Sequence, residues 1–531
     1  MEARTESKAP TQPAYDPSRA RRTIFNALNE ARHRFGRSKA IVVDGDERTL
    51  TYDEVVRAAF ALGHALKTGT APGEAIGVLL PTGIGSIITV FALSAYGRVP
   101  AMLNFTAGEQ GLKAALTMAK VKRIITAHRF IELGKFEALE AWLKPIAQLV
   151  YLEDVREKLS ATDKMTAVLG SVFPRLVAAR TSPDAPAVIL FTSGTEGEPK
   201  GVALSHANIL ANVEQVRAHI QFLDDDVVFN PLPTFHSFGL TVGAFVPLYL
   251  GIKAVLHPTP RQPHEIARRI KEHGATILLA TDTFVSQYAR VSSANELASL
   301  RLAVCGAERL RDETRQLIKR KYKVELLEGY GVTEAAPVIS ANQPGMNRHG
   351  TVGHIMAGIE AKIEPIEGIH DGGRLYVRAP NVMLGYMQVE KPGEIIPLSG
   401  GWHDTGDVVA LDEDGYLSIR GRLKRYAKIG GESVSLTIVE NCASALWPDH
   451  AHAAIAVKDD RKGESIVLVT TNPEGARSDL VVWVHNHGVP ELAIPKRVIR
   501  VVDIPVLGTG KTDYVAVAKL VAKEPEAAPY S

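Results

Sequence analysis

The chain has 531 residues, 45% of them hydrophobic and 23% charged, which is long enough for at least two hydrophobic cores and excludes a disordered or fibrous protein. Its 61 Lys and Arg residues balance 59 Asp and Glu residues, so the net charge favours no nucleic-acid partner. The cysteines, Cys305 and Cys442, lie far apart in apolar surroundings and favour neither a disulfide framework nor a metal cluster, which fits a reducing cytoplasm.

The first part of the chain is polar, and an uncharged stretch follows later. Residues 1–18 contain no apolar core of a secretory signal, and we expect them to form a disordered tail. Residues 75–97 carry no charge over a length that could span a bilayer, which leaves a membrane-spanning alternative open. Pro81, Gly83 and Gly85 break this run in the way typical of a strand, a turn and a helix, so we expect no transmembrane segment.

Short β-branched runs alternate with amphipathic stretches between about residues 39 and 330. This alternation predicts βαβ units and mostly parallel sheets, with strands near 40–43, 77–80, 123–126, 187–190, 254–256, 276–279 and 301–304. After about residue 350, short strands with glycine-rich turns, for example 373–377 and 415–419, predict an antiparallel or barrel-like unit. The charged segment 421–425 then precedes an α+β stretch, and we interpret it as a hinge between a large and a small domain.

A hydroxyl- and glycine-rich loop follows the apolar run 187–190. It reads FTSGTEGEPKGV over residues 191–202. A buried strand that delivers such a loop at its carboxyl end presents backbone N–H groups to phosphates, with hydroxyls as extra donors and Lys200 as a counter-charge. The loop predicts ATP binding, with an ordinary turn as its structural alternative.

Two near-matches to a Walker A loop fail to fit that motif, which requires Gly, four residues and then Gly-Lys-Ser/Thr. Around Lys200, Pro199 stands in place of the second glycine and Gly201 in place of the hydroxyl residue. Around Lys511, Pro505 stands in place of the first glycine. The chain is therefore not predicted to be a P-loop NTPase.

Four further segments follow this loop, and their order is the informative part. Each alone has a structural explanation as a turn, a hairpin or a solvated lysine; they are 231–239 (PLPTFHSFG), 328–334 (EGYGVTE), 401–407 (GWHDTGD) and 508–511 (GTGK). Together and in this order they resemble the AMP-forming, adenylate-forming ligases, which include acyl-CoA synthetases, luciferases and nonribosomal adenylation domains. The resemblance covers residues 23 to 520.

This resemblance implies a multidomain α/β fold. After a disordered tail at 1–18, a large N-terminal domain of two βαβ-type sheets plus a small β-barrel subdomain is expected at 19–423. A small, mobile α+β C-terminal domain is expected at 424–531, with the hinge at Lys424.

Some stretches are similar to the synthetase half of the bacterial bifunctional 2-acylglycerophosphoethanolamine acyltransferase/acyl-(acyl carrier protein) synthetases, namely 235–243, 327–334, 425–429 and 487–493. This closer resemblance implies ATP-dependent activation of a long-chain fatty acid through an acyl-adenylate, with release of pyrophosphate. The acyl group would pass to the phosphopantetheine thiol of acyl carrier protein and feed phospholipid or lipid synthesis. Coenzyme A is the alternative acceptor, and a non-catalytic acyl- or nucleotide-binding relative is a distant alternative.

The resemblance also implies which residues bind ATP and Mg²⁺. The β- and γ-phosphates would lie against the loop donors Thr192, Ser193, Gly194, Thr195, Gly197 and Lys200. Adenine would stack on Tyr330, with the rest of its site formed by Glu328, Gly329, Gly306, Ala307 and Glu308. The ribose would be bound by Asp407, supported by Arg422, and Mg²⁺ by Glu334.

The expected catalytic residues are Lys511, Thr333, Glu334, His236 and Lys428. Lys511 would bridge the attacking carboxylate and the ribose or phosphate oxygens in the first half-reaction, and Thr333 would donate to the α-phosphate. Lys428 would contact the adenylate in the first or the second conformation. His236 would gate the acyl tunnel, with a satisfied structural histidine as its alternative. His219, His257, His485 and His487 are expected to be structural or at the surface, and no spacing suggests a zinc site.

The expected acyl pocket is apolar and consists of Phe238, Leu240, Val242, Phe245, Phe284, Val304, Ala335, Ala336 and Val338. Amino-acid activators place an aspartate early in the region of His236, and this chain shows no such charge there, which favours a fatty acid. Peripheral contact with the inner face of the membrane stays open as an alternative to a purely cytoplasmic location.

Two residues depart from the pattern of many family members. Glu196 replaces Ser, Thr or Gly in the phosphate loop, where a carboxylate weakens ATP binding unless it points outward or shares Mg²⁺. Arg425 follows the hinge lysine, where relatives often carry Asp or Glu. The sequence assigns no role to Arg425.

Overall fold

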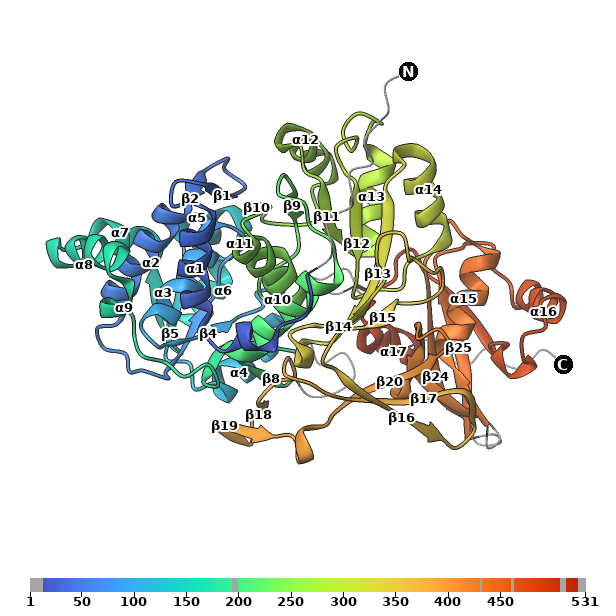
Figure 1. Ribbon diagram of the computed structural model, residues 1–531. Helices are drawn as coiled ribbons and strands as arrows, with labels where there is room; N and C mark the ends of the chain where they lie inside the picture. The colour runs from blue at the N-terminus through green and yellow to red at the C-terminus, as the bar shows by residue number, and fades with distance from the viewer. Residues whose placement is uncertain (1–12, 193–198, 430–431, 460–462, 507–511, 524–531) are drawn as a thin grey trace, which may run out of the picture.

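The computed structural model describes residues 13–192, 199–429, 432–459, 463–506 and 512–523. Over these residues the strands form four sheets, and helices cover the two largest (Figure 1). The two large sheets occupy the left and upper parts of Figure 1, an antiparallel sheet lies below them, and the C-terminal unit, coloured orange and red, lies on the right.

The first large sheet contains the parallel strands of residues 75–191, and antiparallel strands extend it at one edge. Its order is β19 (Lys391–Pro397), β18 (Gly385–Gln388), β8 (Gly201–Ser205), β7 (Pro186–Phe191), β4 (Val99–Met102), β3 (Ala75–Val78), β5 (Arg123–Thr126) and β6 (Gln148–Tyr151). The predicted parallel core is thereby confirmed, and the loop 192–200 connects the antiparallel neighbours β7 and β8.

The second large sheet combines the N-terminal hairpin with strands that follow residue 225. Its order is β15 (His354–Ile355), β14 (Val338–Ala341), β13 (Glu325–Gly331), β12 (Leu302–Cys305), β11 (Ile277–Ala280), β9 (Val227–Asn230), β10 (Lys253–Leu256), β1 (Ala40–Val43) and β2 (Thr49–Thr51). The central strands are parallel, whereas β2, β14 and β15 pair antiparallel.

Two smaller sheets complete the fold. The antiparallel unit predicted after residue 350 is a four-stranded sheet of β16 (Glu360–Ile366), β17 (Ile369–Arg378), β20 (His403–Leu411) and β21 (Leu417–Arg422). The C-terminal unit is α+β, and its sheet contains β23 (Glu432–Ser435), β22 (Tyr426–Ile429), β25 (Gly463–Thr470), β24 (His452–Asp459) and β26 (Arg497–Arg500).

The helices are mostly short. Those of the large unit are α1 (Ile24–Phe35), α2 (Tyr52–Leu66), α3 (Ile84–Ala95), α4 (Gly108–Met118), α5 (His128–Gly134), α6 (Glu137–Leu143), α7 (Leu152–Glu157), α8 (Ala161–Val172), α9 (Pro174–Val177), α10 (His206–His219), α11 (Val246–Leu250), α12 (Pro263–His273), α13 (Asp282–Val291) and α14 (Asp312–Tyr322). The C-terminal unit adds α15 (Leu436–Leu446), α16 (Arg477–Asn486) and α17 (Tyr514–Lys523). The 3-10 turns are η1 (Pro17–Ala20), η3 (Thr333–Ala335), η4 (Ser399–Gly401), η5 (Leu423–Arg425) and η6 (Glu491–Ala493), and η2 (Phe238–Phe245) is a π-helix.

The uncharged stretch 75–97 forms strand β3, a turn and helix α3, as its proline and glycines predict. Within the described part of the chain, no helix combines the length and hydropathy that crossing a bilayer requires. The predicted disordered tail 1–18 needs a correction at its end. The carbonyl oxygen of Ala14 accepts a hydrogen bond from Arg217 of α10, and the Asp16 side chain caps η1.

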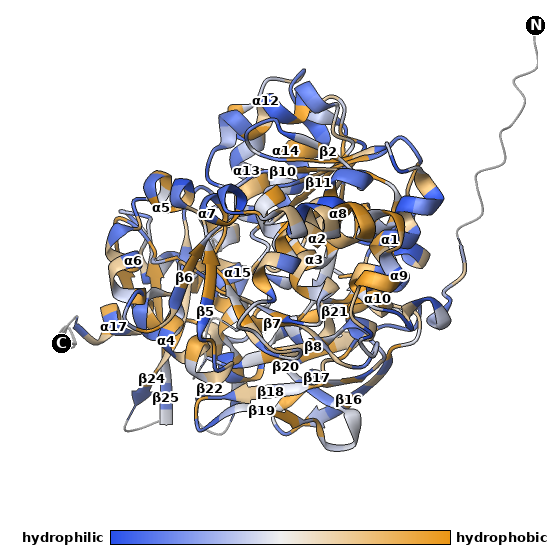
Figure 2. Ribbon diagram, turned by 90° about the vertical axis from the view of Figure 1, so that its left-hand side faces the viewer, coloured by the Kyte–Doolittle hydropathy of each residue, from blue (hydrophilic) through white to orange (hydrophobic). Residues whose placement is uncertain are grey.

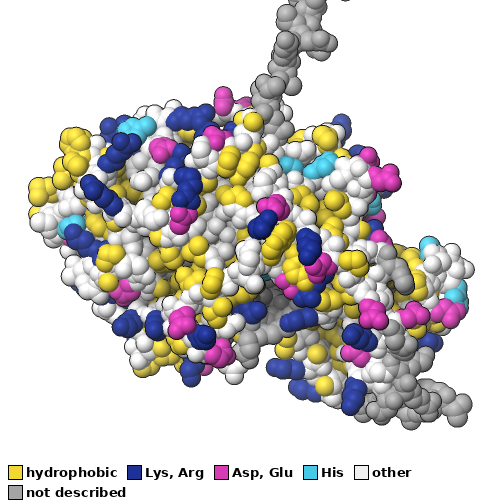
Figure 3. Space-filling view, turned by 60° about the horizontal axis from the view of Figure 1, so that its bottom comes forward, with side chains coloured by type: hydrophobic (Ala, Val, Ile, Leu, Met, Phe, Trp, Pro, Cys, Tyr) yellow, Lys and Arg dark blue, Asp and Glu magenta, His cyan; other side chains and the backbone are white. Residues whose placement is uncertain are grey.

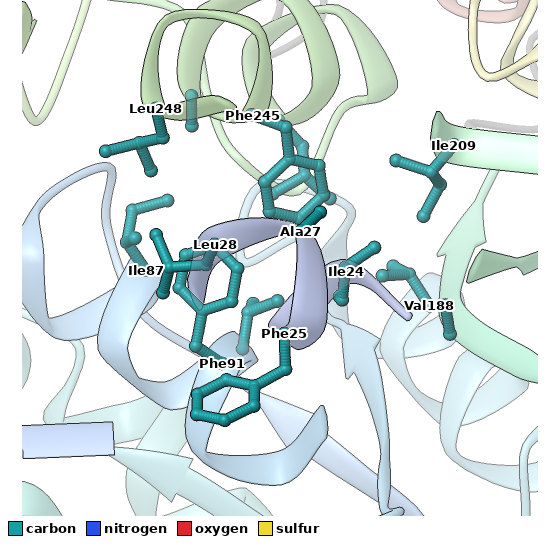
Figure 4. Packing of buried hydrophobic residues seen from close by; sticks show 14 of the residues in the cluster. Ile24, Phe25, Ala27, Leu28, Ile87, Phe91, Val188, Ile209, Phe245 and Leu248 are labelled. Carbon is teal, nitrogen blue, oxygen red and sulfur yellow. The ribbon is translucent and has the colours of Figure 1, made fainter. Parts of the chain in front are cut away.

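Helix α1 fills the seam between the helices of the two large sheets. Figure 4 shows Ile24, Phe25 and Leu28 of α1 among side chains that include Phe91 of α3 and Phe245 of η2. All five are buried, and the Phe91 and Phe245 rings lie 5.7 Å apart. In Figure 2, hydrophobic colour concentrates on inner strands such as β5, whereas an outer helix such as α12 shows much hydrophilic colour. Burial of this apolar surface stabilises the arrangement of the sheets.

Helix α2 packs closely on α3 because Gly63 has no side chain. A Cβ atom on Gly63 would lie 2.4 Å from Cδ2 of Tyr96 and 2.5 Å from the carbonyl oxygen of Ala92. We expect Gly63→Ala to destabilise the protein by about 1–3 kcal/mol through overpacking, seen as a lower melting temperature. Gly83→Ala is the control, because Gly83 has extended backbone and nothing nearer than 3.8 Å. Equal melting temperatures for the two variants would contradict this prediction.

Candidate active site

A cavity of about 940 Å³ opens at the carboxyl ends of the parallel strands β11, β12 and β13, where open α/β sheets place their ligands. The last residues of these strands and the residues just after them line the cavity, namely 281–283, 305–309 and 329–334. The C-terminal unit contributes to the same lining with Glu440, Asn441, Ser444, Ala451, His452, Ile504, Val506, Thr512 and Tyr514. The two units therefore share one cavity.

Tyr330 and Arg422 line this cavity, and both bond Asp407, which is absent from its described lining. The buried carboxylate of Asp407 accepts hydrogen bonds from the Tyr330 hydroxyl at 2.5 Å and from Nε of Arg422 at 2.9 Å. Burial, followed by the nearby charge of Asp407, raises the pKa of Tyr330 well above its ordinary value, so this tyrosine stays protonated.

Glu334, Tyr386 and Lys200 form a second polar group of the lining. The Tyr386 hydroxyl donates to Oε1 of Glu334 at 2.7 Å, and Nζ of Lys200 lies 4.5 Å from the centroid of the Tyr386 ring. Sequence reasoning missed Tyr386, since it lies in no predicted motif. Strand β18 pairs Tyr386 with Val202 of β8, and only this pairing brings it beside Lys200.

The predicted phosphate loop is described at both of its ends. Thr192 and Lys200 line the cavity, and they bond each other, because the backbone N–H of Lys200 donates to Oγ1 of Thr192 at 3.1 Å. Ser193, Gly194, Thr195, Glu196 and Gly197 lie outside the described residues.

Of the other residues predicted for the adenine site, some line the cavity and one lies in the protein interior. Gly306, Ala307, Glu308 and Gly329 line the cavity. Burial raises the pKa of Glu308, whose carboxylate accepts a hydrogen bond from the backbone of Thr283 at 3.1 Å. The predicted binding residue Glu328 is absent from the described lining, because its side chain faces Arg315 at 3.3 Å and accepts from the backbone of Leu310.

Apolar side chains form a large part of the same cavity. We call this set the apolar lining; it consists of Val216, Ile220, Phe222, Val228, Leu232, Val242, Val246, Ile277, Leu279, Leu302, Val304, Leu327, Val338, Ala341 and Met356. The sequence predicted Val242, Val304 and Val338 for the acyl pocket, and it also predicted Phe238, which lines the cavity as well. The apolar lining can enclose an aliphatic or aromatic group.

Five residues predicted for the acyl pocket lie elsewhere. Helix η2 presents Phe238 and Val242, four residues apart, to the cavity, so Leu240 and Phe245 point into the core between the sheets. The other three pack in hydrophobic cores, namely Phe284, Ala335 and Ala336.

The predicted gate residue His236 lines the cavity, with its ring 4.9 Å from that of Phe235. Other histidines are structural, as predicted. Burial lowers the pKa of His257 to about 4, and the buried His219 bonds the carbonyl oxygen of Ala341. His485 pairs with Glu491 at the surface.

The predicted catalytic lysines belong to the C-terminal unit. Lys511 lies outside the described residues, and the neighbouring Thr512 lines the cavity together with Thr333. Lys428 is exposed on β22, outside the described lining, and its backbone N–H donates to Glu464. Thr512 thus contributes to the cavity lining, whereas Lys428 does not belong to the described lining.

Arg425, for which the sequence offered no role, ties the predicted hinge segment 421–425 to helices of the C-terminal unit. Its guanidinium lies 3.5 Å from the centroid of the Tyr514 ring and donates to Glu440 at 2.8 Å. The same Glu440 oxygen accepts from the Tyr514 hydroxyl and from the backbone of Ala454. Because Glu440 belongs to α15 and Tyr514 begins α17, this cluster joins Arg425 to both helices.

We expect Arg425→Ala to loosen α17, because the partly buried Glu440 loses its guanidinium partner. Removing one partner of a buried ion pair lowers the free energy of unfolding by about 3–5 kcal/mol. Amide hydrogen exchange should become faster in α15 and α17 and stay unchanged in α10. Arg420→Ala is the control, because the Arg420–Asp371 pair is far more exposed. The prediction fails if both variants exchange at the same rate in α17.

The polar residues fit a magnesium ion held mainly by substrate oxygens. Among the described residues, no group of three or more His, Cys, Asp or Glu side chains is arranged to hold a metal. Mg²⁺ commonly takes only one or two protein carboxylates together with phosphate oxygens and water. The Glu334 carboxylate, which lines the cavity near Lys200 and Tyr386, is a suitable ligand of this kind.

Solved structures share this fold. ATP-bound MatB from Rhodopseudomonas palustris matches with a TM-score of 0.79 and 24% identity, over 94% of this chain and 99% of that chain. The anthranilate CoA ligase AuaEII in complex with anthranoyl-AMP matches with a TM-score of 0.78 and 22% identity, over 96% and 100% of the two chains. The arrangement of two large sheets, an antiparallel sheet and a smaller α+β unit is that of adenylate-forming enzymes.

The model of the family "AMP-binding enzyme" matches residues 28–387, and the chain belongs to this family. It is an AMP-forming acid–thiol ligase that uses ATP. Among its relatives, the medium-chain fatty-acid–CoA ligase of Escherichia coli (strain K12) is 26% identical over 89% of this chain and 86% of the relative. The long-chain-fatty-acid–CoA ligase of Salmonella typhimurium (strain LT2) is 27% identical over 92% and 93% of the two chains.

Proposed function

We propose that the protein activates a fatty acid with ATP and transfers the acyl group to a phosphopantetheine thiol, with acyl carrier protein as the first choice of acceptor. The apolar lining carries this proposal, since it gives the cavity that Tyr330, Arg422 and Glu334 line a surface suited to an alkyl chain. The relatives named fatty-acid–CoA ligases support a fatty acid and keep coenzyme A as the alternative acceptor. Resemblance of segments such as 425–429 to acyl-(acyl carrier protein) synthetases supports the carrier protein.

In the first half-reaction, a carboxylate oxygen of the acid attacks the α-phosphorus of ATP, and the bond to pyrophosphate breaks. The obstacle is repulsion between anions, so fixed positive charge and N–H or O–H donors lower the barrier. In the proposal, Lys200 and the loop 192–200 hold the β- and γ-phosphates, Thr333 contacts the α-phosphate, and Lys511 bridges the carboxylate. Glu334 holds Mg²⁺, which neutralises phosphate charge when bound.

The nucleoside part of ATP is assigned to the group around Tyr330. Asp407 accepts from the ribose hydroxyls, while Arg422 and the Tyr330 hydroxyl hold its carboxylate in place. The adenine stacks on Tyr330 between the segments 306–308 and 328–330. These two bonds fix the Asp407 carboxylate, which reduces the ordering that ribose binding requires.

In the second half-reaction, the thiol sulfur attacks the acyl carbonyl carbon, the thiol proton leaves to solvent, and AMP departs. Movement of the C-terminal unit about Lys424 would withdraw Lys511 and open a path for the thiol, with Lys428 moving toward the adenylate. The domain boundary at 423/424 belongs to this proposal. The location proposed for the enzyme is cytoplasmic, with peripheral contact at the inner face of the membrane and products that enter phospholipid or lipid synthesis.

An acceptor competition tests the proposal. Labelled palmitate and ATP are supplied with equal amounts of holo acyl carrier protein and coenzyme A, and the two thioesters are separated and counted. A predominance of acyl carrier protein thioester is expected, and a predominance of acyl-CoA would favour the alternative. ATP–pyrophosphate exchange that responds to aromatic or amino acids but to no fatty acid would overturn the substrate class. No exchange with any acid would favour a non-catalytic relative.

A further inference from the structure

Helix α8 buries its small residues and exposes its large apolar ones, which is the reverse of an ordinary surface helix. It packs on α2 with Ala167, Gly170 and Ser171, all buried. Gly170 allows the close approach, since a Cβ there would lie 2.6 Å from the Phe60 ring. Its large apolar side chains face outward. A helix in a soluble protein normally buries such residues, so this face calls for a partner.

The outward face continues through the short helix α9 as one stripe, which we call the α8–α9 face. Its members recur every three or four residues and are 48–80% exposed: Met165, Val168, Leu169, Val172, Phe173 and Leu176. Figure 1 places α8 at the left-hand end of the molecule, away from the C-terminal unit. In Figure 3 hydrophobic side chains reach this left-hand edge beside lysines and arginines.

The exposed charges within residues 158–180 are basic, although Glu157 is exposed just before them and Lys158 lies 4.0 Å from Asp154 of α7. Residues 158–180 contain Lys158, Lys164, Arg175 and Arg180, all exposed, and one acid, Asp163. Asp163 points inward, where its carboxylate lies 2.6 Å from Nδ1 of His64 and caps the start of α8. An apolar stripe bordered by exposed cations complements a surface of anionic headgroups over hydrocarbon.

We propose that the α8–α9 face docks the enzyme on anionic phospholipid membranes, with the apolar side chains inserted among the headgroups and the cations on lipid phosphates. This proposal names the surface that makes the membrane contact included in the proposed function. It rests on that function in one respect: docking brings the enzyme to its substrate if that substrate is a fatty acid, because fatty acids partition into membranes. The cavity lies on other elements, so the face serves as an anchor, and acid activation in solution does not require it.

Vesicle flotation tests the proposal without ATP. The full-length protein is mixed with vesicles of phosphatidylcholine containing phosphatidylglycerol, or with phosphatidylcholine alone. We expect binding to the anionic vesicles that weakens in high salt, and at least an approximately tenfold loss of partitioning in Phe173→Asp/Leu176→Asp. Lys164→Glu/Arg175→Glu should also bind less. Val482→Asp is the matched control, since Val482 is 60% exposed on helix α16 of the C-terminal unit.

The outcomes separate this proposal from the proposed function. Failure of the unaltered protein to float, or equal flotation of all variants, would overturn membrane docking and leave acid activation intact. A dimer that becomes monomeric in Phe173→Asp/Leu176→Asp would also overturn it, since a second copy would then occupy the face. Exchange with octanoate in solution, measured on the same variants, should equal that of the unaltered protein. Its absence in every sample would contradict the proposed function alone.

Discussion

Replacing Glu334 by glutamine should lower acid-dependent ATP–pyrophosphate exchange by about a hundredfold to a thousandfold. Glutamine keeps an oxygen that can accept from Tyr386 but removes the negative charge proposed to hold Mg²⁺. The loss should therefore appear in catalysis and in the Mg²⁺ dependence, while the melting temperature changes little. Exchange rates measured over a range of Mg²⁺ concentrations, with part of the rate recovered at high Mg²⁺, provide the check.

Two further variants show whether the loss in Glu334→Gln comes from its charge at this site. Tyr386→Phe removes only the 2.7 Å hydrogen bond to Glu334 and should cost much less activity. Glu360→Gln is the control for loss of a carboxylate, since Glu360 is exposed on β16 and pairs with Arg378. If Glu334→Gln retains the rate and the Mg²⁺ dependence of the unaltered protein, the proposed metal ligand is wrong.

Lys511→Ala should reduce the first half-reaction by about 10²–10³-fold, the usual cost of one preorganised donor at a developing charge. The measurement is again ATP–pyrophosphate exchange with a fatty acid. Transfer from a preformed acyl-adenylate to the thiol should proceed at a normal rate in the same variant. That difference follows from the proposal that Lys511 leaves the site before the thiol arrives.

Lys523→Ala is the control for this prediction, because Lys523 is exposed at the end of α17. It removes the same charge from the same unit and should change neither half-reaction. A normal exchange rate in Lys511→Ala would contradict the role proposed for this lysine, and an equal loss in both half-reactions would contradict its departure.

Local sequence patterns predicted the strands well, because β-branched runs such as 40–43 and 123–126 favour an extended, half-buried backbone. They could not predict which sheet each strand joins. Strand β1 pairs with β10, which lies more than two hundred residues later in the chain. Strands β3 and β4, which are much nearer in sequence, belong to the other large sheet. Such pairing depends on packing between distant segments, which a local pattern does not contain.

The candidate site shows the same limit at the level of single residues. Tyr330 and Asp407 were found through their motifs and Arg422 through the family resemblance, and the structure brings the three within hydrogen-bond distance. Tyr386 lies in an edge strand with no motif, and only the pairing of β18 with β8 places it beside Lys200. Apolar residues were assigned less well, since Leu240 and Val242 differ only in the direction that η2 gives them.

The shared cavity also has a thermodynamic consequence. Residues of the C-terminal unit, such as Thr512 and Tyr514, and residues of the large unit, such as Thr333, line the same space. A ligand that touches both sides adds part of its binding free energy to the contact between the units, by mass action. Filling the cavity should thus hold the units together and oppose the movement about Lys424 that we propose. Tight binding of the intermediate would then slow turnover, so the enzyme gains most from contacts that weaken once pyrophosphate has left.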